Sequence, residues 1–210
     1  MSAEALDIAD YNADEDLLDA LRADGRARVR VYRPARPLVV LGRGSKPHVE
    51  LHIDACLADG VSVTRRRGGG CAVVLDEGNV IVAAVHREAG FGANKRLLDD
   101  YSRWLIDGLA RSGVPEVRFA GICDLAVGER KIAGACLYRA RDVVFYSASL
   151  LVAPRLELLS RYLAHPPREP DYRRGRAHDA FVTTLDAHVG GLAAETLEAR
   201  LRATLDPFDS

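Results

Sequence analysis

Short apolar runs, separated by glycine, proline or charged residues, set the pattern of this chain. Residues 28–32 alternate arginine with valine before a tyrosine, which predicts a half-buried strand. Residues 38–41 form an uninterrupted branched apolar run, as expected of a strand buried on both faces. Similar runs predict strands at residues 61–64, 79–86, 117–119, 125–127, 131–137 and 143–152. The turn-forming residues 76–78 predict a hairpin that leads into the strand at 79–86.

Apolar residues within 94–112 recur every three or four positions, which predicts a helix that ends at Gly113 and covers the sheet. Trp104 lies in this apolar stripe, so we assign it to the core. Further helices are predicted between Asn12 or Asp14 and Gly25, and at residues 49–57, 156–163 and 193–205. The proline-rich residues 165–176 predict an irregular surface loop or a mobile cover. Strands outnumber helices and hairpins join most of them, so we expect an α+β fold with a mixed, largely antiparallel sheet covered by helices.

Length and charge limit the possible partners. A chain of 210 residues with 48% hydrophobic content can form one domain with a proper core, so we predict a single domain over residues 1–210, large enough to be a catalytic domain. The net charge of −1 gives no bulk attraction to nucleic acid or to an anionic membrane. No apolar run approaches the roughly 18 residues of a membrane span. The acidic N-terminal residues do not resemble a signal peptide, which predicts a cytoplasmic protein.

Cysteine and lysine are both scarce in this chain. The four cysteines, Cys56, Cys71, Cys123 and Cys136, lack the spacing of a zinc site and a secretory context, so we expect free thiols. Lysine occurs only at positions 46, 95 and 131, and every other basic side chain is arginine. A lysine within a motif is therefore of interest, because its compact ammonium differs chemically from a guanidinium.

A glycine-rich stretch lies between two apolar runs at residues 64–79, which read T-R-R-R-G-G-G-C-A-V-V-L-D-E-G-N. Glycines let backbone N–H groups approach a flat or anionic ligand, and the preceding arginines supply forked donors for carboxylate or phosphate. A glycine-rich hairpin turn with solvated arginines is the alternative interpretation.

A second motif covers residues 123–136, C-D-L-A-V-G-E-R-K-I-A-G-A-C, and predicts a strand, a tight turn and a strand with Lys131 near its start. Both stretches resemble the lipoate–protein ligase A family, whose motifs are R-R-x-S-G-G-G-x-V-x-H-D followed by G-N, and N-D-L-x-V…R-K-x-S-G-S-A. The matching residues are Arg65, Arg66, Gly69, Gly70, Val73, Asp76, Gly78, Asn79, Asp124, Leu125, Val127, Arg130, Lys131 and Gly134. The resemblance covers roughly residues 10–185 and implies the biotin/lipoate ligase catalytic-domain type of fold.

The resemblance implies that lipoate, or a similar medium-chain acid, reacts with ATP to form acyl-AMP, and that the acyl group passes to a lysine of a lipoyl-carrier protein. Such a carrier is an H-protein, a dehydrogenase E2 or a similar domain. Lys131 is the implied catalytic residue, and Asp124 is either an Mg²⁺ ligand or a turn-forming residue. ATP and acyl-adenylate binding is assigned to Arg65, Arg66, Gly69, Gly70, Cys71, Asp76, Gly78, Asn79, Lys131 and Gly134. Within this set we expect Asp76 to orient the loop.

The chain departs from the family pattern at several polar positions. Leu75 stands in place of histidine, Ser45 in place of glutamine, and residues 145–148 replace a His-Gly-Thr or His-Gly-Ser segment. Each change is expected to remove a polar group from the pocket and to alter substrate, rate or reaction. The chain also ends before the C-terminal accessory domain of larger relatives, so a separate subunit supplies that part or the enzyme works without it.

Two alternatives keep the fold and change the function. The first is an ATP-independent octanoyl or lipoyl transferase, with Cys123 as nucleophile and the Lys131 ammonium favouring its thiolate. Cys71 and Cys136 are the next candidates, although small buried thiols often have no such role. The second is a non-catalytic relative that binds lipoyl carriers.

Overall fold

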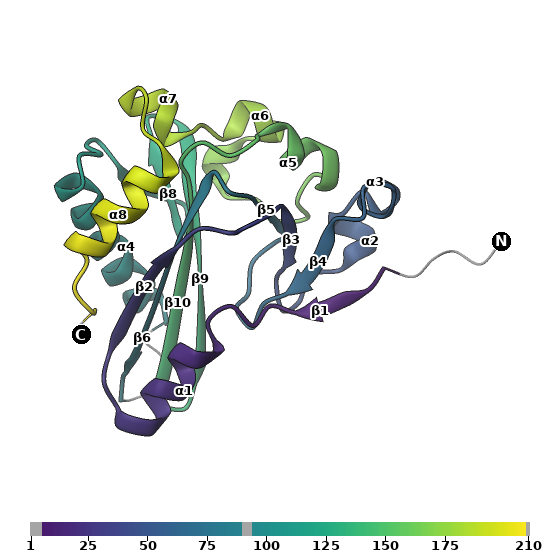
Figure 1. Ribbon diagram of the computed structural model, residues 1–210. Helices are drawn as coiled ribbons and strands as arrows, with labels where there is room; N and C mark the ends of the chain where they lie inside the picture. The colour runs from purple at the N-terminus through teal and green to yellow at the C-terminus, as the bar shows by residue number, and fades with distance from the viewer. Residues whose placement is uncertain (1–5, 90–93, 209–210) are drawn as a thin grey trace.

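The computed structural model describes residues 6–89 and 94–208, and its strands form two sheets (Figure 1). The larger sheet has the order β2-β6-β10-β9-β8-β7 and is antiparallel throughout. Its strands are β2 (Arg28–Tyr32), β6 (Asn79–Arg87), β7 (Arg118–Ala120), β8 (Asp124–Val127), β9 (Arg130–Ala140) and β10 (Val143–Leu151). The expected α+β class with largely antiparallel pairing is therefore confirmed.

The smaller sheet has the order β1-β4-β3-β5 and mixed strand directions. Its strands are β1 (Ile8–Asp10), β3 (Leu38–Leu41), β4 (Ser62–Arg65) and β5 (Val73–Leu75). Strands β1 and β3 run parallel to β4, whereas β5 runs antiparallel to β3. The sequence did not predict β1, which is short and lies at the edge of this sheet.

The hairpin predicted at residues 76–78 is wrong. Strand β5 pairs with β3, and β6 pairs with β2 and β10, so both edges of β6 already have partners. Residues 76–78 instead carry the chain from the smaller sheet to the larger one. A short turn between apolar strands cannot by itself show whether the strands pair with each other or with distant partners.

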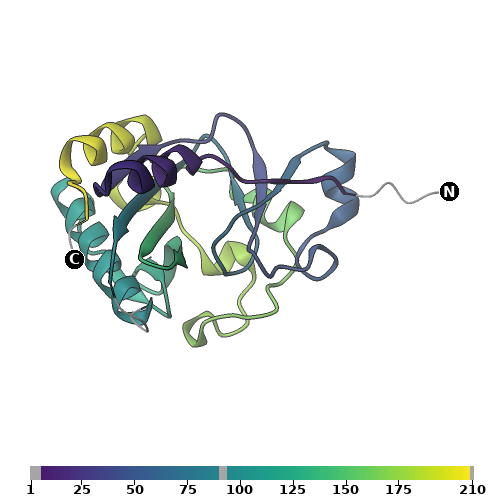
Figure 2. The same ribbon diagram turned by 90° about the horizontal axis from the view of Figure 1, so that it is seen from below.

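Helices α4 (Asn94–Arg111) and α8 (Ala194–Thr204) cover one face of the larger sheet, and the smaller sheet lies on the other side (Figures 1 and 2). The predicted apolar stripe of α4 is confirmed, because Leu97, Tyr101, Leu105 and Leu109 are fully buried. Tyr101 stacks on Tyr146 of β10, with ring centroids 4.3 Å apart. The face of the larger sheet that α4 covers is therefore occupied by core.

Shorter helices surround the two sheets. They are α1 (Glu15–Asp24), α2 (Pro47–Glu50), α3 (Ile53–Ala58), α5 (Glu157–Tyr162), α6 (His178–Phe181) and α7 (Leu185–Val189), with a 3₁₀ turn η1 (Asp171–Arg173). The single helix expected at 49–57 is divided into α2 and α3. Leu51 pairs there with Leu163, and the His52 N–H donates to the Tyr162 carbonyl, so both residues leave the helix. No helix among residues 6–89 and 94–208 combines the length and apolar character needed to cross a membrane.

Candidate functional site

A cavity of about 580 Å³ lies between the two sheets. Its size is in the range of small-molecule sites, roughly 300–1,000 Å³. The glycine-rich loop contributes Gly69, Gly70 and Cys71, and β8 and β9 contribute Asp124 and Lys131. Both sequence motifs therefore meet at one cavity, although they lie in different sheets.

A β-bulge places Lys131 on the cavity face. Asp124 of β8 is paired with Gly134 of β9, but Ala126, two residues on, is paired with Lys131. Strand β9 thus carries one extra residue, which reverses the alternation of side chains between positions 131 and 134. As a result Lys131, Gly134 and Asp124 share one face of the sheet. The Thr183 N–H donates to the Lys131 carbonyl at 2.9 Å and fixes this backbone position.

Lys131 and Asp124 form a close ion pair at the cavity wall. Lys131 Nζ lies 2.7 Å from Asp124 Oδ1, and the Tyr172 hydroxyl donates to Asp124 Oδ2 at 2.9 Å. The Lys131 side chain keeps 26% of its surface exposed, against 10% for Asp124. The carboxylate is therefore held from two sides, while the ammonium remains accessible from the cavity.

Gly134 provides the space that the Lys131 ammonium occupies. A Cβ at this position would lie 2.8 Å from Lys131 Nζ and 3.6 Å from Asp124 Oδ1. Any larger residue would push the ammonium away from its partner. The glycine of the second motif is thus explained by close approach of a side chain.

Arg65 and Arg66 use their guanidinium groups to hold main-chain carbonyls. Arg65 donates to the carbonyls of Gly42 and Ser45, at 2.9 and 3.0 Å. Arg66 donates to the carbonyls of Val40, Gly69 and Cys71, at 3.1, 2.7 and 2.9 Å. Both arginines therefore order the glycine-rich loop and the segment beside it, and of the two only Arg66 lines the cavity within the described part of the chain.

Ser45 and Glu50 support the glycine-rich loop through hydrogen bonds. The Ser45 hydroxyl donates to Glu50 Oε2 at 3.0 Å, and the same oxygen accepts the Ala72 N–H at 2.6 Å. Both side chains are buried. Ser45, which replaces the usual glutamine, does not line the cavity among the described residues. Ser45 therefore offers no polar group to the cavity and acts on the loop instead. The supporting role of Glu50 was not predicted from the sequence.

Asp76, Gly78 and Asn79 form the connection between the two sheets. Asp76 is buried and accepts the N–H groups of Gly78 and Arg155, at 2.8 and 2.9 Å, while Asn79 Oδ1 accepts the Asp76 N–H at 2.8 Å. A Cβ at Gly78 would lie 2.1 Å from the Ala153 carbonyl oxygen, so only glycine fits there. Across the described ranges, the cavity lining includes neither these three residues nor Arg65.

The other two departures from the family pattern lie on different sides of the larger sheet. Leu75 lines the cavity and is 4% exposed. Tyr146 packs on Tyr101 in the core on the far face, whereas its neighbour Ser147 lines the cavity. Leu75 therefore makes the cavity wall more apolar, and the change at Tyr146 acts on the core.

Cys123 and Cys136 also line the cavity, with partly exposed side chains. Burial raises the pKa of the Cys123 thiol; nearby Asp124 raises it further, while Lys131 lowers it. Burial also raises the pKa of Cys136, and Arg66 opposes this rise. The thiolate that the transferase alternative requires is thus disfavoured overall, although Lys131 acts on Cys123 in the expected direction.

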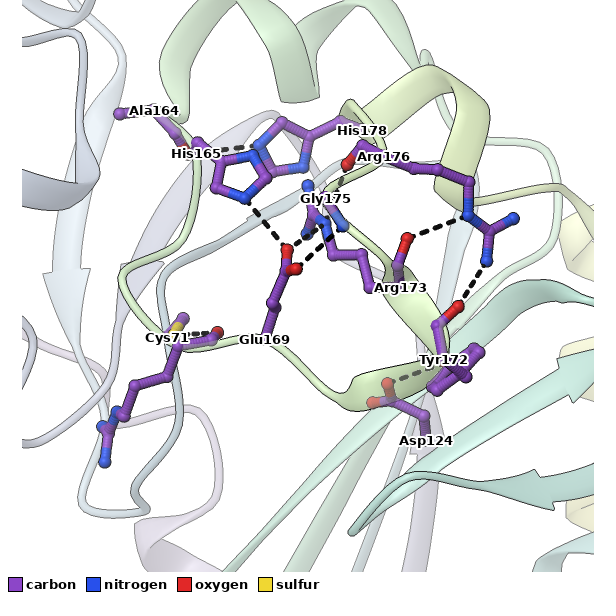
Figure 3. Close-up of polar contacts among 11 residues, drawn as sticks. Cys71, Asp124, Ala164, His165, Glu169, Tyr172, Arg173, Gly175, Arg176 and His178 are labelled. Atoms are coloured by element: carbon purple, nitrogen blue, oxygen red, sulfur yellow. Dashed lines mark hydrogen bonds and ion pairs between the residues drawn. The ribbon is translucent and has the colours of Figure 1, made fainter.

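The segment 165–176 contributes to the cavity wall and touches both motifs (Figure 3). Cys71 Sγ contacts the Arg168 carbonyl at 3.7 Å, and Tyr172 reaches Asp124. The Glu169 carboxylate accepts His165 Nε2 and the Gly175 N–H, at 2.9 and 2.8 Å. These bonds keep the pKa of Glu169 below its usual range, with the Gly175 N–H as the main cause. The sequence predicted an irregular cover here but did not identify Tyr172 as a partner of Asp124.

Within residues 6–89 and 94–208, no group of three or more His, Cys, Asp or Glu side chains is arranged to hold a metal ion. In the described cavity lining, Asp124 is the one carboxylate that forms an ion pair with Lys131. It could therefore bind a metal ion only together with ligands from another molecule, such as phosphate oxygens.

Comparisons with known proteins place these observations in context. Residues 9–206 match the family model described as lipoyl protein ligase A/B catalytic domain. The lipoate-protein ligase A of Psychrobacter cryohalolentis is 33% identical over 134 residues, which are 61% of this chain and 36% of that protein. This chain therefore aligns with only about a third of that relative's length.

Two solved structures share the fold. One is the bipartite lipoate protein ligase of Thermoplasma acidophilum, studied with its E2 lipoyl domain, with a TM-score of 0.76 at 20% identity. The aligned region covers 95% of this chain and 80% of the chain of that ligase. A lipoate-protein ligase A bound with ATP has a TM-score of 0.74 at 21% identity, covering 90% of this chain and 74% of its own. At these identities the similarity establishes the architecture, and the chemistry must be argued from the cavity.

Proposed function

Because this chain belongs to the lipoyl protein ligase A/B catalytic-domain family, we propose that it activates lipoate, or a similar medium-chain acid, with ATP and transfers the acyl group to a lysine of a lipoyl-carrier domain. The observation that carries this proposal is the Lys131–Asp124 pair, held at 2.7 Å on the cavity face by the bulge in β9. It provides one accessible ammonium at the junction of both family motifs.

In the first step, a carboxylate oxygen of the acid attacks the α-phosphorus of ATP, and pyrophosphate leaves as acyl-AMP forms. Two anions must approach each other, which is unfavourable without a nearby positive charge. The Lys131 ammonium supplies that charge from the cavity wall. Asp124 holds the ammonium in place, so little reorganisation is needed during the reaction.

In the second step, the neutral amine of the acceptor lysine attacks the carbonyl carbon of acyl-AMP. The amide bond forms, the amine loses a proton, and AMP leaves with the electrons of the broken C–O bond. Negative charge develops on the carbonyl oxygen, and a positioned ammonium stabilises it. Lys131 therefore serves both steps, with Gly134 providing its space.

ATP and Mg²⁺ would share the polar end of the cavity. The donor set fits, because Mg²⁺ commonly binds one or two carboxylates together with substrate phosphates, and Asp124 offers one carboxylate. When bound, the ion neutralises charge on the phosphates. The main chain of Gly69 and Gly70 offers close approach to the nucleotide and acyl group, while Arg65 and Arg66 keep that loop ordered. Asp76, Gly78 and Asn79 contribute by fixing the connection between the sheets.

The acceptor is a lipoyl-carrier domain of the H-protein or dehydrogenase E2 type. The Thermoplasma acidophilum ligase with a similar fold was studied with its E2 lipoyl domain, and it is bipartite. By analogy, residues 1–210 form one catalytic domain that can work with a separate accessory subunit. The raised pKa of Cys123 counts against the thioester route, and the Lys131–Asp124 pair counts against a purely binding role.

The activation step can be tested without a carrier. Purified protein is incubated with Mg·ATP, labelled pyrophosphate and lipoate or octanoate, and label entering ATP is measured. We expect exchange that requires the acid, that is lost in Lys131→Ala, and that is retained in Lys95→Ala, where an exposed lysine is removed. Exchange without added acid, or full exchange in Lys131→Ala, would contradict the proposed mechanism.

A further inference from the structure

A second hollow, of about 770 Å³, lies beside the candidate site. Chain segments around β1, β4 and the connection from β2 to β3 line it, including Tyr32, Leu38 and Val63. Among residues 6–89 and 94–208, Tyr11 is the one side chain that lines both this hollow and the site cavity. The tyrosine thus stands where the two spaces come closest.

An apolar cluster continues the wall on both sides of Tyr11. Val40, Leu75 and Ile81 form its buried centre, and all three line the site cavity. Tyr32 and Leu38 pack against the same cluster and line the second hollow. Side chains of this one cluster therefore line both spaces and form the partition between them, and the Tyr11 ring is part of it.

Hydrogen bonds fix the orientation of the Tyr11 ring. Its hydroxyl lies 3.0 Å from the Tyr32 hydroxyl, which in turn donates to Asp14 Oδ2 at 3.0 Å. Because Tyr32 uses its proton on Asp14, Tyr11 donates to Tyr32. The Tyr11 N–H also donates to the Arg65 carbonyl at 2.9 Å. Both ends of the residue are held, so the ring cannot swing aside at low cost.

The cavity wall has a polar part, formed by Lys131 and Asp124, and an apolar part, formed by Val40, Leu75 and Ile81. Lys131 and Gly134 lie near the start of this strand, and Cys136 lies further along it. Tyr11 and Cys136 both line the site cavity. At 3.3 Å per residue, the path along the strand from Lys131 to Cys136 is about 16 Å. An acyl chain with its carboxylate at Lys131 would therefore extend along β9 toward Tyr11.

We propose that Tyr11 sets the maximum length of the acyl chain that the site accepts, by closing the cavity against the second hollow. This inference rests on the proposed function and adds the residue that limits the length of the acid. Tyr11 acts as a specificity residue that contacts the end of the chain, remote from the reacting carboxylate. Removing the ring joins the two hollows and makes room for longer acids.

The test measures acid-dependent pyrophosphate exchange across unbranched acids from hexanoate to hexadecanoate. In the unchanged protein we expect a maximum at medium length and a steep loss beyond it. In Tyr11→Ala the maximum moves to longer acids, because each additional buried methylene is worth about fourfold in affinity. The ratio of kcat/KM for hexadecanoate to that for octanoate should rise by at least about tenfold.

Two controls separate the ring from its hydroxyl. Tyr11→Phe and Tyr32→Phe break the hydrogen-bond chain but leave a ring in each position, so both should keep the original length preference. Tyr11→Trp enlarges the partition and should shift the maximum to shorter acids, which gives a second test if Tyr11→Ala does not fold. Thermal unfolding of each variant checks folding.

A folded Tyr11→Ala with an unchanged length profile would overturn the inference. If the unchanged protein shows no exchange with any acid, the proposed function fails. Binding of octanoate and hexadecanoate, measured by calorimetry without ATP, then tests Tyr11 independently. A gain in hexadecanoate binding by Tyr11→Ala alone supports the partition, and equal binding by all variants refutes it.

Discussion

At the scale of single residues, the position of the Lys131 side chain depends on two neighbours, Asp124 and Gly134. Its ammonium is fixed by one carboxylate and fits because residue 134 has no side chain. The sequence motifs identified Lys131, Asp124 and Gly134 correctly as neighbours of the cavity. They could not identify Tyr172 or Tyr11, because those contacts join residues that are far apart in the chain and follow no local pattern.

Substituting Gly134 tests the space occupied by the ammonium. In Gly134→Ala, the new methyl group would lie 2.8 Å from Lys131 Nζ and force it away from Asp124. We expect pyrophosphate exchange to fall by roughly 10²-fold, a size typical of a misplaced catalytic group. Gly44→Ala is the matched control, because a Cβ there has open space around it. Comparable activity in the two variants would argue against this role of Gly134.

Asp14 should make stability depend on pH. Burial raises the pKa of Asp14 from 3.8 to about 6, although Tyr32 and Arg30 oppose the shift. Between these two values the folded protein holds a proton that the unfolded chain has lost, so stability falls as pH rises through this window. A shift of this size corresponds to about 3 kcal/mol of unfolding free energy.

Asp14→Asn removes this dependence and can still accept the Tyr32 hydroxyl. The free energy of unfolding of the variant, relative to that of the unchanged protein, should therefore be higher at pH 8 than at pH 4 when both are unfolded with urea. The comparison is the difference between the two proteins at each pH, since other groups titrate equally in both. A constant difference across this range would contradict the assignment to Asp14.

At the scale of elements, the sequence predicted strands and the long helix well because their apolar periodicity reflects burial. It failed where pairing partners decide the structure, as at β5 and β6, and for very short elements such as β1, α6 and α7. The glycine-rich loop was located correctly, but its support was not. Glu50 bonds to Ser45 and to Ala72, which is 22 positions further along the chain, and no local sequence pattern indicates that contact.

Glu50 therefore offers a test of the loop support. In Glu50→Ala, the Ala72 N–H loses its acceptor, and the Ser45 hydroxyl keeps only the Gly70 carbonyl, at 3.3 Å. An unsatisfied buried polar group costs about 1–3 kcal/mol, so unfolding by urea should occur at a clearly lower concentration. Glu157→Ala, which removes a first-turn acidic residue of α5, is the control and should have little effect. Unchanged stability in Glu50→Ala would refute the supporting role.

The segment 165–176 is tied to the site through Tyr172. Tyr172→Phe removes the hydrogen bond to Asp124 but keeps the ring packed near Phe181. We expect faster proteolytic cleavage within residues 165–176 and a several-fold loss of activity, because Asp124 and Lys131 are then held from one side only. Tyr162→Phe loses a hydroxyl contact to Asp59, outside the described cavity lining, and serves as the control. Equal protection of the segment in both variants would contradict the link.

At the scale of the whole molecule, two sheets enclose the cavity, and each supplies one motif. Residues 76–78 connect the sheets, and Asp76 ties that connection to Arg155. The face of the larger sheet opposite the cavity is covered by α4, α8 and the stacked Tyr101 and Tyr146. The core therefore fills one side of the larger sheet and the candidate cavity lies on the other, with Tyr146 on the core side.

The most direct test of the central claim is the intact mass of a lipoyl-carrier domain after incubation with this protein, lipoate and Mg·ATP. A parallel reaction contains octanoyl-carrier and no ATP. We predict that the acyl group is added only with ATP, that Lys131→Ala abolishes the addition, and that Cys123→Ser retains it. Addition only in the reaction without ATP, lost in Cys123→Ser, would contradict the ligase mechanism and establish the thioester route instead.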